Sequence, residues 1–89
     1  MSEAFNYILP HDLDVAGAHT ARTGLLEAIE GAVAQGRLGL EVAGTGASQI
    51  SMQLLFAGML ECRELGVELD LGPNAEAVQD LVHVLEQEA

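Results

Sequence analysis

The stretch LGLEVAGTGASQISMQLL, residues 38–55, decides the fold class of this chain. Its first part alternates apolar and polar side chains, as a half-buried strand does. The apolar positions of this strand are Leu38, Leu40 and Val42. A glycine-containing loop follows, and a helix then begins at about Ser48 or Gln49. A strand, a glycine loop and a helix in this order predict an α/β protein.

Three further segments alternate in the same way and predict strands. Their apolar positions are Phe5, Tyr7 and Leu9; Leu13 and Val15; and Val67, Leu69 and Leu71. The intervening positions of the later segments are Asp12, Asp14, Gly39, Glu41, Glu68 and Asp70. We therefore predict a small mixed sheet of about four strands with one dry face and one wet, acidic face. Helices on both faces would require continuously apolar strands, so we expect three helices mainly on one face.

Helical spacing of apolar residues predicts these three helices, in the order strand, strand, helix, strand, helix, strand, helix. The first runs from about Ala18 to Gln35, with Gly36 as the residue that follows its end. The second ends at Leu65, before Gly66. The third follows Pro73, with Asn74 as the predicted N-cap. It carries an apolar stripe of Val78, Leu81, Val82 and Leu85.

The composition argues against some classes of function without identifying one. The chain has 89 residues, which we interpret as a single domain over residues 1–89, and its formal net charge is −11 with no lysine. Nucleic-acid affinity depends on Lys and Arg, so the three scattered arginines argue against a nucleic-acid partner. An anionic membrane surface would also repel the chain.

Local motifs for catalysis, metal or cofactor binding are weak. The single cysteine, Cys62, excludes an intramolecular disulfide, and the three histidines have no metal-ligand spacing. The N-terminal segment MSEAFNYILP has no basic region followed by a long apolar run. We therefore expect a cytoplasmic protein that is not an enzyme, does not insert into a membrane, and has no metal and no cofactor.

The glycine loop and the helix after it are the strongest indication of function in the sequence. A dinucleotide fingerprint would need a glycine at Gln49, and a P-loop would need a lysine. Thr45, Ser48 and Ser51 place hydroxyls where a phosphate would be favoured, although a serine there also serves as a helix cap. Ile50 and Leu54 are predicted to point away from the sheet. They either form a docking surface or are buried by the neighbouring helices.

Four segments together resemble a STAS domain, the fold of bacterial anti-sigma-factor antagonists and of related chemotaxis-associated proteins. They are LPHDLDVA (9–16), the helix over 18–35, SMQLLFA (51–57) and GVELDLGP (66–73). The resemblance spans almost the whole chain and rests on pattern. It implies a small sheet with helices on one face and a role in binding a signalling protein.

Regulated members of that family are phosphorylated at the start of the second helix, in the motif Asp-Ser-Ser/Thr-Gly-Leu. With Met52 aligned to the leucine, Ser48 takes the place of the aspartate and Gln49 that of the first serine. Ile50 stands at the phosphorylated position and Ser51 at the glycine. The resemblance thus implies a binding role without the phosphoswitch, unless a one-residue shift makes Ser51 the acceptor.

These observations predict a non-catalytic regulatory module of bacterial signalling that docks on a kinase or anti-sigma-type ATPase. The predicted contact residues are Thr45, Ser48, Gln49, Ile50, Ser51 and Leu54, and the possible phosphorylation sites are Ser51 and Ser48. Two alternatives stay open at this point. One is a cytoplasmic STAS accessory subunit of an ABC-type lipid transporter, and the other is a small protein that binds a ligand or nucleotide.

Overall fold

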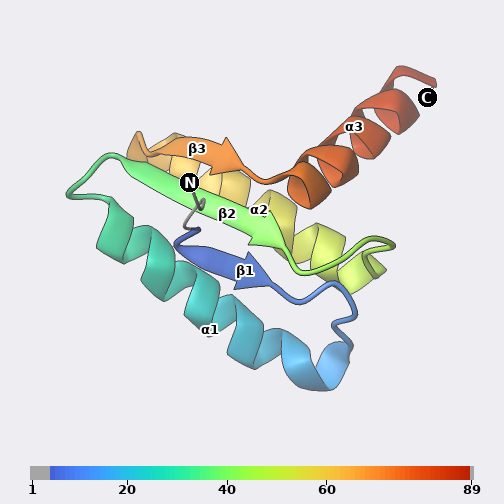
Figure 1. The fold of residues 1–89 in the computed structure, drawn as a ribbon, viewed down its shortest axis with the longest axis horizontal. Coiled ribbons are helices and arrows are strands. Elements are labelled where there is room, and N and C mark those ends of the chain that lie inside the picture. The colour runs from blue at the N-terminus through green and yellow to red at the C-terminus, as the bar shows by residue number, and fades with distance from the viewer. Residues whose placement is uncertain (1–4, 89) are drawn as a thin grey trace.

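Three strands alternate with three helices in the computed structural model, which describes residues 5–88, with side chains described for residues 5–81. The elements are β1 (Tyr7–Leu9), α1 (Val15–Ala32), β2 (Arg37–Val42), α2 (Gln49–Leu65), β3 (Glu68–Leu71) and α3 (Pro73–Glu88). The strands form a sheet in the order β1-β2-β3 (Figure 1). Both pairs are parallel, with Tyr7 opposite Leu40 and Leu40 opposite Leu71. Over residues 5–88 the chain is therefore a small α/β protein with a three-stranded parallel sheet.

The strand predicted at Leu13 and Val15 is not formed, so the prediction of a mixed sheet of about four strands was wrong on both counts. Asp14 instead caps α1, because its Oδ1 accepts a hydrogen bond from the Gly17 backbone N–H at 3.0 Å. Val15 is the first residue of α1 and is 82% exposed. The helix thus begins three residues before the predicted Ala18, and it ends correspondingly early, at Ala32.

One face of the sheet is dry, as predicted. Leu38, Leu40 and Val42 of β2 are fully buried. They belong to one core with Leu25 and Ile29 of α1 and with Leu55 and Cys62 of α2. The two helices lie close together over this face, because a Cβ on Gly58 of α2 would stand only 2.8 Å from Leu25 Cδ2. Both ends of α2 match the prediction, with Ser48 as N-cap and a left-handed Gly66 at the C-terminus.

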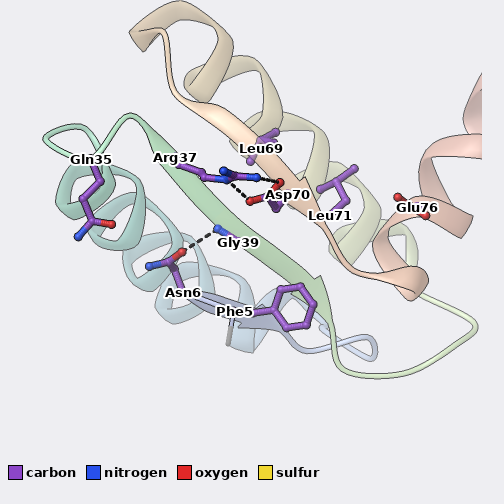
Figure 2. A pocket seen from close by; sticks show the side chains of 9 residues that line it. All are labelled: Phe5, Asn6, Gln35, Arg37, Gly39, Leu69, Asp70, Leu71 and Glu76. Atoms are coloured by element: carbon purple, nitrogen blue, oxygen red, sulfur yellow. Dashed lines mark hydrogen bonds and ion pairs between the residues drawn. The ribbon is translucent and has the colours of Figure 1, made fainter. Parts of the chain in front are cut away.

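The opposite face of the sheet is largely open, and Figure 2 looks onto it. Because side chains alternate along a strand, the residues on this face have the parity opposite to that of the core positions. Ile8 is half exposed here, and Arg37 forms an exposed ion pair with Asp70 of the neighbouring strand. Gly39, which has no side chain, lies among the polar side chains of Asn6, Arg37 and Asp70. The predicted polar face is confirmed in this part of the sheet.

Glu41 is the exception on this face, because it is only 8% exposed. Its Oε1 accepts hydrogen bonds from the backbone N–H groups of Ala75 and Val42, each at 2.9 Å. Its Oε2 accepts one from the Asn74 N–H at 3.4 Å. A residue in the central strand therefore supplies the capping carboxylate for α3.

The prediction that Asn74 caps α3 was therefore wrong. Asn74 lies within the first turn, and its side-chain Nδ2 donates to the Val42 carbonyl at 3.0 Å. From this attachment α3 leads away from the sheet (Figure 1). Of the predicted stripe on this helix, Val78 is buried and Leu81 is 53% exposed. Val82 and Leu85 lie outside the described side chains.

Candidate functional site

The loop between β2 and α2 lies at the carboxyl ends of the strands, where parallel α/β sheets commonly bind ligands. Gly46 in this loop has a φ of +71°, a left-handed conformation that favours glycine. A Cβ on Gly44 would stand 3.1 Å from His11 Nδ1, so glycine also lets the β1–α1 loop approach closely. The two glycines are accounted for by the turn and by this contact between loops.

The two serines at the start of α2 are used to join the helix to the β1–α1 loop. Ser48 Oγ accepts from the Ser51 N–H at 3.2 Å and donates to the Leu13 carbonyl at 2.7 Å. Ser51 Oγ donates to the Pro10 carbonyl at 2.8 Å and accepts from the Leu13 N–H at 3.2 Å. Ser51 is 1% exposed, so a phosphate could reach its hydroxyl only if these bonds broke and the helix start moved. Ser48 is half-buried.

The other predicted contact residues differ in their accessibility. Thr45 and Gln49 are exposed, and Ile50 is half-buried. Leu54 is half-buried and packs against the core. The apolar start of α2 is thus partly an outer surface and partly a core element. The structure places Thr45, Gln49 and Ile50 where a partner can reach them, and it places Ser51 in the interior.

A small apolar groove of about 200 Å³ adjoins this loop. Its walls come from the β2–α2 loop, the first turn of α2 and the apolar face of α3 that carries Val78 and Leu81. The lining residues are Gly44, Thr45, Gly46, Ala47, Met52, Asn74, Ala77, Val78 and Leu81. Sequence reasoning missed the contribution of α3. The strand order of a parallel sheet would have indicated it, because the loops that follow neighbouring parallel strands meet at the same edge of the sheet.

The arginines are distributed unevenly between the two ends of the sheet, whereas carboxylates occur at both, with Glu64 and Glu68 exposed at the end where the strands begin. At the carboxyl end of the strands, the β1–α1 loop carries the exposed Asp12 and Asp14. On α3, which follows β3 at this end of the sheet, Glu76 and Asp80 are also exposed. Of the three arginines in the chain, Arg37 begins β2 and Arg63 lies in the last turn of α2, so both are at the opposite end. The third, Arg22, lies about two turns into α1.

A second hollow, of about 610 Å³, lies on the open face of the sheet above Gly39 (Figure 2). Asn6 is fixed at its rim, because its Oδ1 accepts from the Gly39 N–H at 2.7 Å. The Arg37 guanidinium is bound to Asp70, with Nη2 donating to Oδ1 at 3.0 Å. This hydrogen bond holds the pKa of the Asp70 carboxyl below its ordinary value. The cation in the hollow is therefore already paired with an anion of the same chain.

Two features often used in catalysis, an accessible thiol and a metal-binding cluster, are not found among the side chains of residues 5–81. Cys62 is buried, and desolvation, with a smaller contribution from Glu61, raises the pKa of its thiol. The thiol is therefore protonated and a poor nucleophile. Among residues 5–81 there is no cluster of three or more His, Cys, Asp or Glu side chains that could hold a metal ion.

Comparison of the chain with protein-family models, with curated proteins and with solved structures finds no match. Over the residues that the structure describes, none of the helices is both long enough and apolar enough to cross a membrane.

Proposed function

We propose that this chain is a non-catalytic protein-interaction module of bacterial signalling, of STAS type. It docks on a kinase or anti-sigma-type ATPase through the β2–α2 loop and the start of α2. The observation that carries this proposal is a pair of accessible side chains, Thr45 in the loop and Gln49 at the start of α2, together with the apolar groove that Thr45 lines.

The chemistry of this surface favours contact over reaction. The hydroxyls of Ser48 and Ser51 are engaged inside the chain, and the thiol of Cys62 is buried. The side chains left to a partner are a threonine, a glutamine and the half-buried Ile50. Such groups provide shape and apolar area for recognition, and none of them is a general acid, a base or an activated nucleophile.

The placement of Ser51 also supports a module without a phosphoswitch. In the STAS alignment, Ile50 occupies the position that is phosphorylated in regulated members, and isoleucine has no hydroxyl. A one-residue shift would make Ser51 the acceptor, but Ser51 is 1% exposed and its hydroxyl donates to the Pro10 carbonyl. We therefore propose that partner binding is not switched by phosphorylation of this chain.

The test is an affinity pull-down from native extract with three versions of the protein, followed by identification of bound proteins by mass spectrometry. Gln49→Arg places a bulky cation in the proposed contact surface. Gln35→Arg makes the same change at the exposed Gln35, at the other end of the sheet, and serves as the matched control.

Recovery of a kinase or anti-sigma-type ATPase by the wild type and by Gln35→Arg, with loss in Gln49→Arg, is the expected result. Recovery of a transporter ATPase would contradict the signalling function and support the function as a transporter accessory subunit. Equal recovery by Gln49→Arg and Gln35→Arg would show that the contact lies elsewhere.

A further inference from the structure

We infer that the groove beside α3 receives an apolar side chain from a basic amphipathic helix of the partner. This inference rests on the proposed function, because it names the chemistry of the segment that docks at the same end of the sheet. It adds α3 to the contact surface, with an apolar side chain of the partner in the groove and the partner's basic side chains toward Asp12, Asp14 and Asp80.

The groove has the size and lining for a single apolar anchor. Its volume of about 200 Å³ is close to that of one large side chain. Met52 forms one wall, and Ala77, Val78 and Leu81 form the other. Leu81 is 53% exposed at the open side, so an inserted side chain would cover a leucine that now contacts water. Burial of apolar area at such a position is the main source of binding energy in helix-in-groove recognition.

The charge around the groove specifies the rest of the occupant. Asp12 and Asp14 lie on the loop next to Gly44, and Asp80 precedes Leu81 on α3. The nearby His11 contacts Gly44, and both Arg37 and Arg63 are at the opposite end of the sheet. A segment that presents lysine or arginine on both sides of its apolar anchor would therefore be attracted and oriented here.

The same charge argues against a second copy of this chain as the occupant. Two molecules that each carry a formal charge of −11 would bring like charges together at this surface. Like charges across an interface lower affinity and slow association. A basic partner removes this repulsion, and a helix supplies apolar side chains at the spacing that fits a narrow groove between a loop and α3.

The experiment measures binding of three helical peptides of about 18 residues by calorimetry, at low and at moderate salt. The first peptide has leucine at i, i+3, i+4 and i+7 and lysine elsewhere. The second replaces every lysine with glutamate, and the third keeps lysine but replaces every leucine with alanine. Each is tested against the wild type, Leu81→Gln and Leu60→Gln. Leu60 is 59% exposed on α2, so the control removes a similar exposed leucine without changing the charge.

We expect only the leucine–lysine peptide to bind, with an affinity that falls as the salt concentration rises. Its affinity should be about tenfold weaker for Leu81→Gln and unchanged for Leu60→Gln. Equal weakening by Leu81→Gln and Leu60→Gln would overturn the groove as the site. Comparable binding of the glutamate peptide would overturn the basic partner. No binding of any peptide would overturn the inference.

The proposed function is tested separately by the partner recovered from native extract. If the Gln49→Arg variant loses that partner and the Leu81→Gln variant keeps it, docking through the loop stands and the groove inference fails. If both variants keep it, docking at this end of the sheet fails as well.

Discussion

Replacing Glu41 with alanine should destabilise the protein far more than an ordinary polar substitution on a sheet surface. Its carboxylate is buried and accepts backbone hydrogen bonds from Val42, Asn74 and Ala75. In the variant, the N–H groups of Val42 and Ala75 lose their acceptor in buried surroundings. A buried donor left without a partner costs about 1–3 kcal/mol, and loss of a helix cap costs about 0.5–2 kcal/mol. We expect a total loss of about 2–4 kcal/mol.

The assay is urea unfolding followed by far-ultraviolet circular dichroism. With a slope of about 1–3 kcal/mol per molar urea, the urea midpoint should fall by roughly 0.7–4 M. Glu41→Gln keeps one carbonyl oxygen for the Ala75 N–H but turns an amide NH₂ toward another donor. The loss of unfolding free energy in this variant should therefore be about half as large. Glu68→Ala is the control, because Glu68 is an exposed carboxylate on β3, and surface changes usually stay within about 0.5 kcal/mol. A loss below about 0.5 kcal/mol in Glu41→Ala would refute the capping role.

Three further predictions follow from contacts elsewhere in the chain. Gly58→Ala should have a free energy of unfolding about 1–3 kcal/mol below that of Gly31→Ala in thermal melts, because its Cβ would stand 2.8 Å from Leu25 Cδ2 while both changes gain similar helix propensity. Gly31→Ala, with nothing within 4 Å, should not lower it; similar losses in both variants would contradict the close helix approach. The Cys62 thiol should react with Ellman's reagent only on unfolding, since it is buried with a raised pKa, and rapid labelling of the native protein would refute this. The pKa of Asp70 is lowered in the fold, so its pairing stabilises the protein above the ordinary carboxyl pKa and is lost as the pH falls through the folded value. The difference in stability between wild type and Asp70→Asn should therefore vanish in acid, and a difference that persisted or grew there would contradict the ion pair.

The elements with strong local signals at both ends were predictable from the sequence. The second helix has a serine cap at Ser48 and a glycine at Gly66, and its observed limits agree with the prediction. The strand predicted at Leu13 and Val15 failed because its alternation rested on only two apolar residues. Asp14 lies between them, three residues before Gly17, and its side chain forms a helix cap there. The capping signal was local, and it outweighed a short period-two pattern.

The candidate site was predictable in position but not in composition. The glycine loop and the exposed Thr45 and Gln49 could be read from residues 38–55, because loop and helix are adjacent in the sequence. Burial of Glu41 could not be read in this way, since it depends on Ala75, which is 34 residues away. The alternation assigned Glu41 correctly to the polar face, but the first turn of α3 covers that part of the face. The role of α3 in the groove likewise depends on strand order.

The two outer strands of the sheet have a consequence for association of the folded protein. β1 has three residues and β3 has four, and each pairs with β2 on one side only among the described residues. Unpaired strand edges invite other chains to add a strand, and short, charged edges discourage this. β3 carries Glu68 and Asp70, and the whole chain is strongly anionic at neutral pH. As the pH falls toward the isoelectric point near 4.2, these carboxylates take up protons and the mutual repulsion fades. Self-association through strand edges should therefore be greatest in mild acid, while the folded protein stays dispersed at neutral pH.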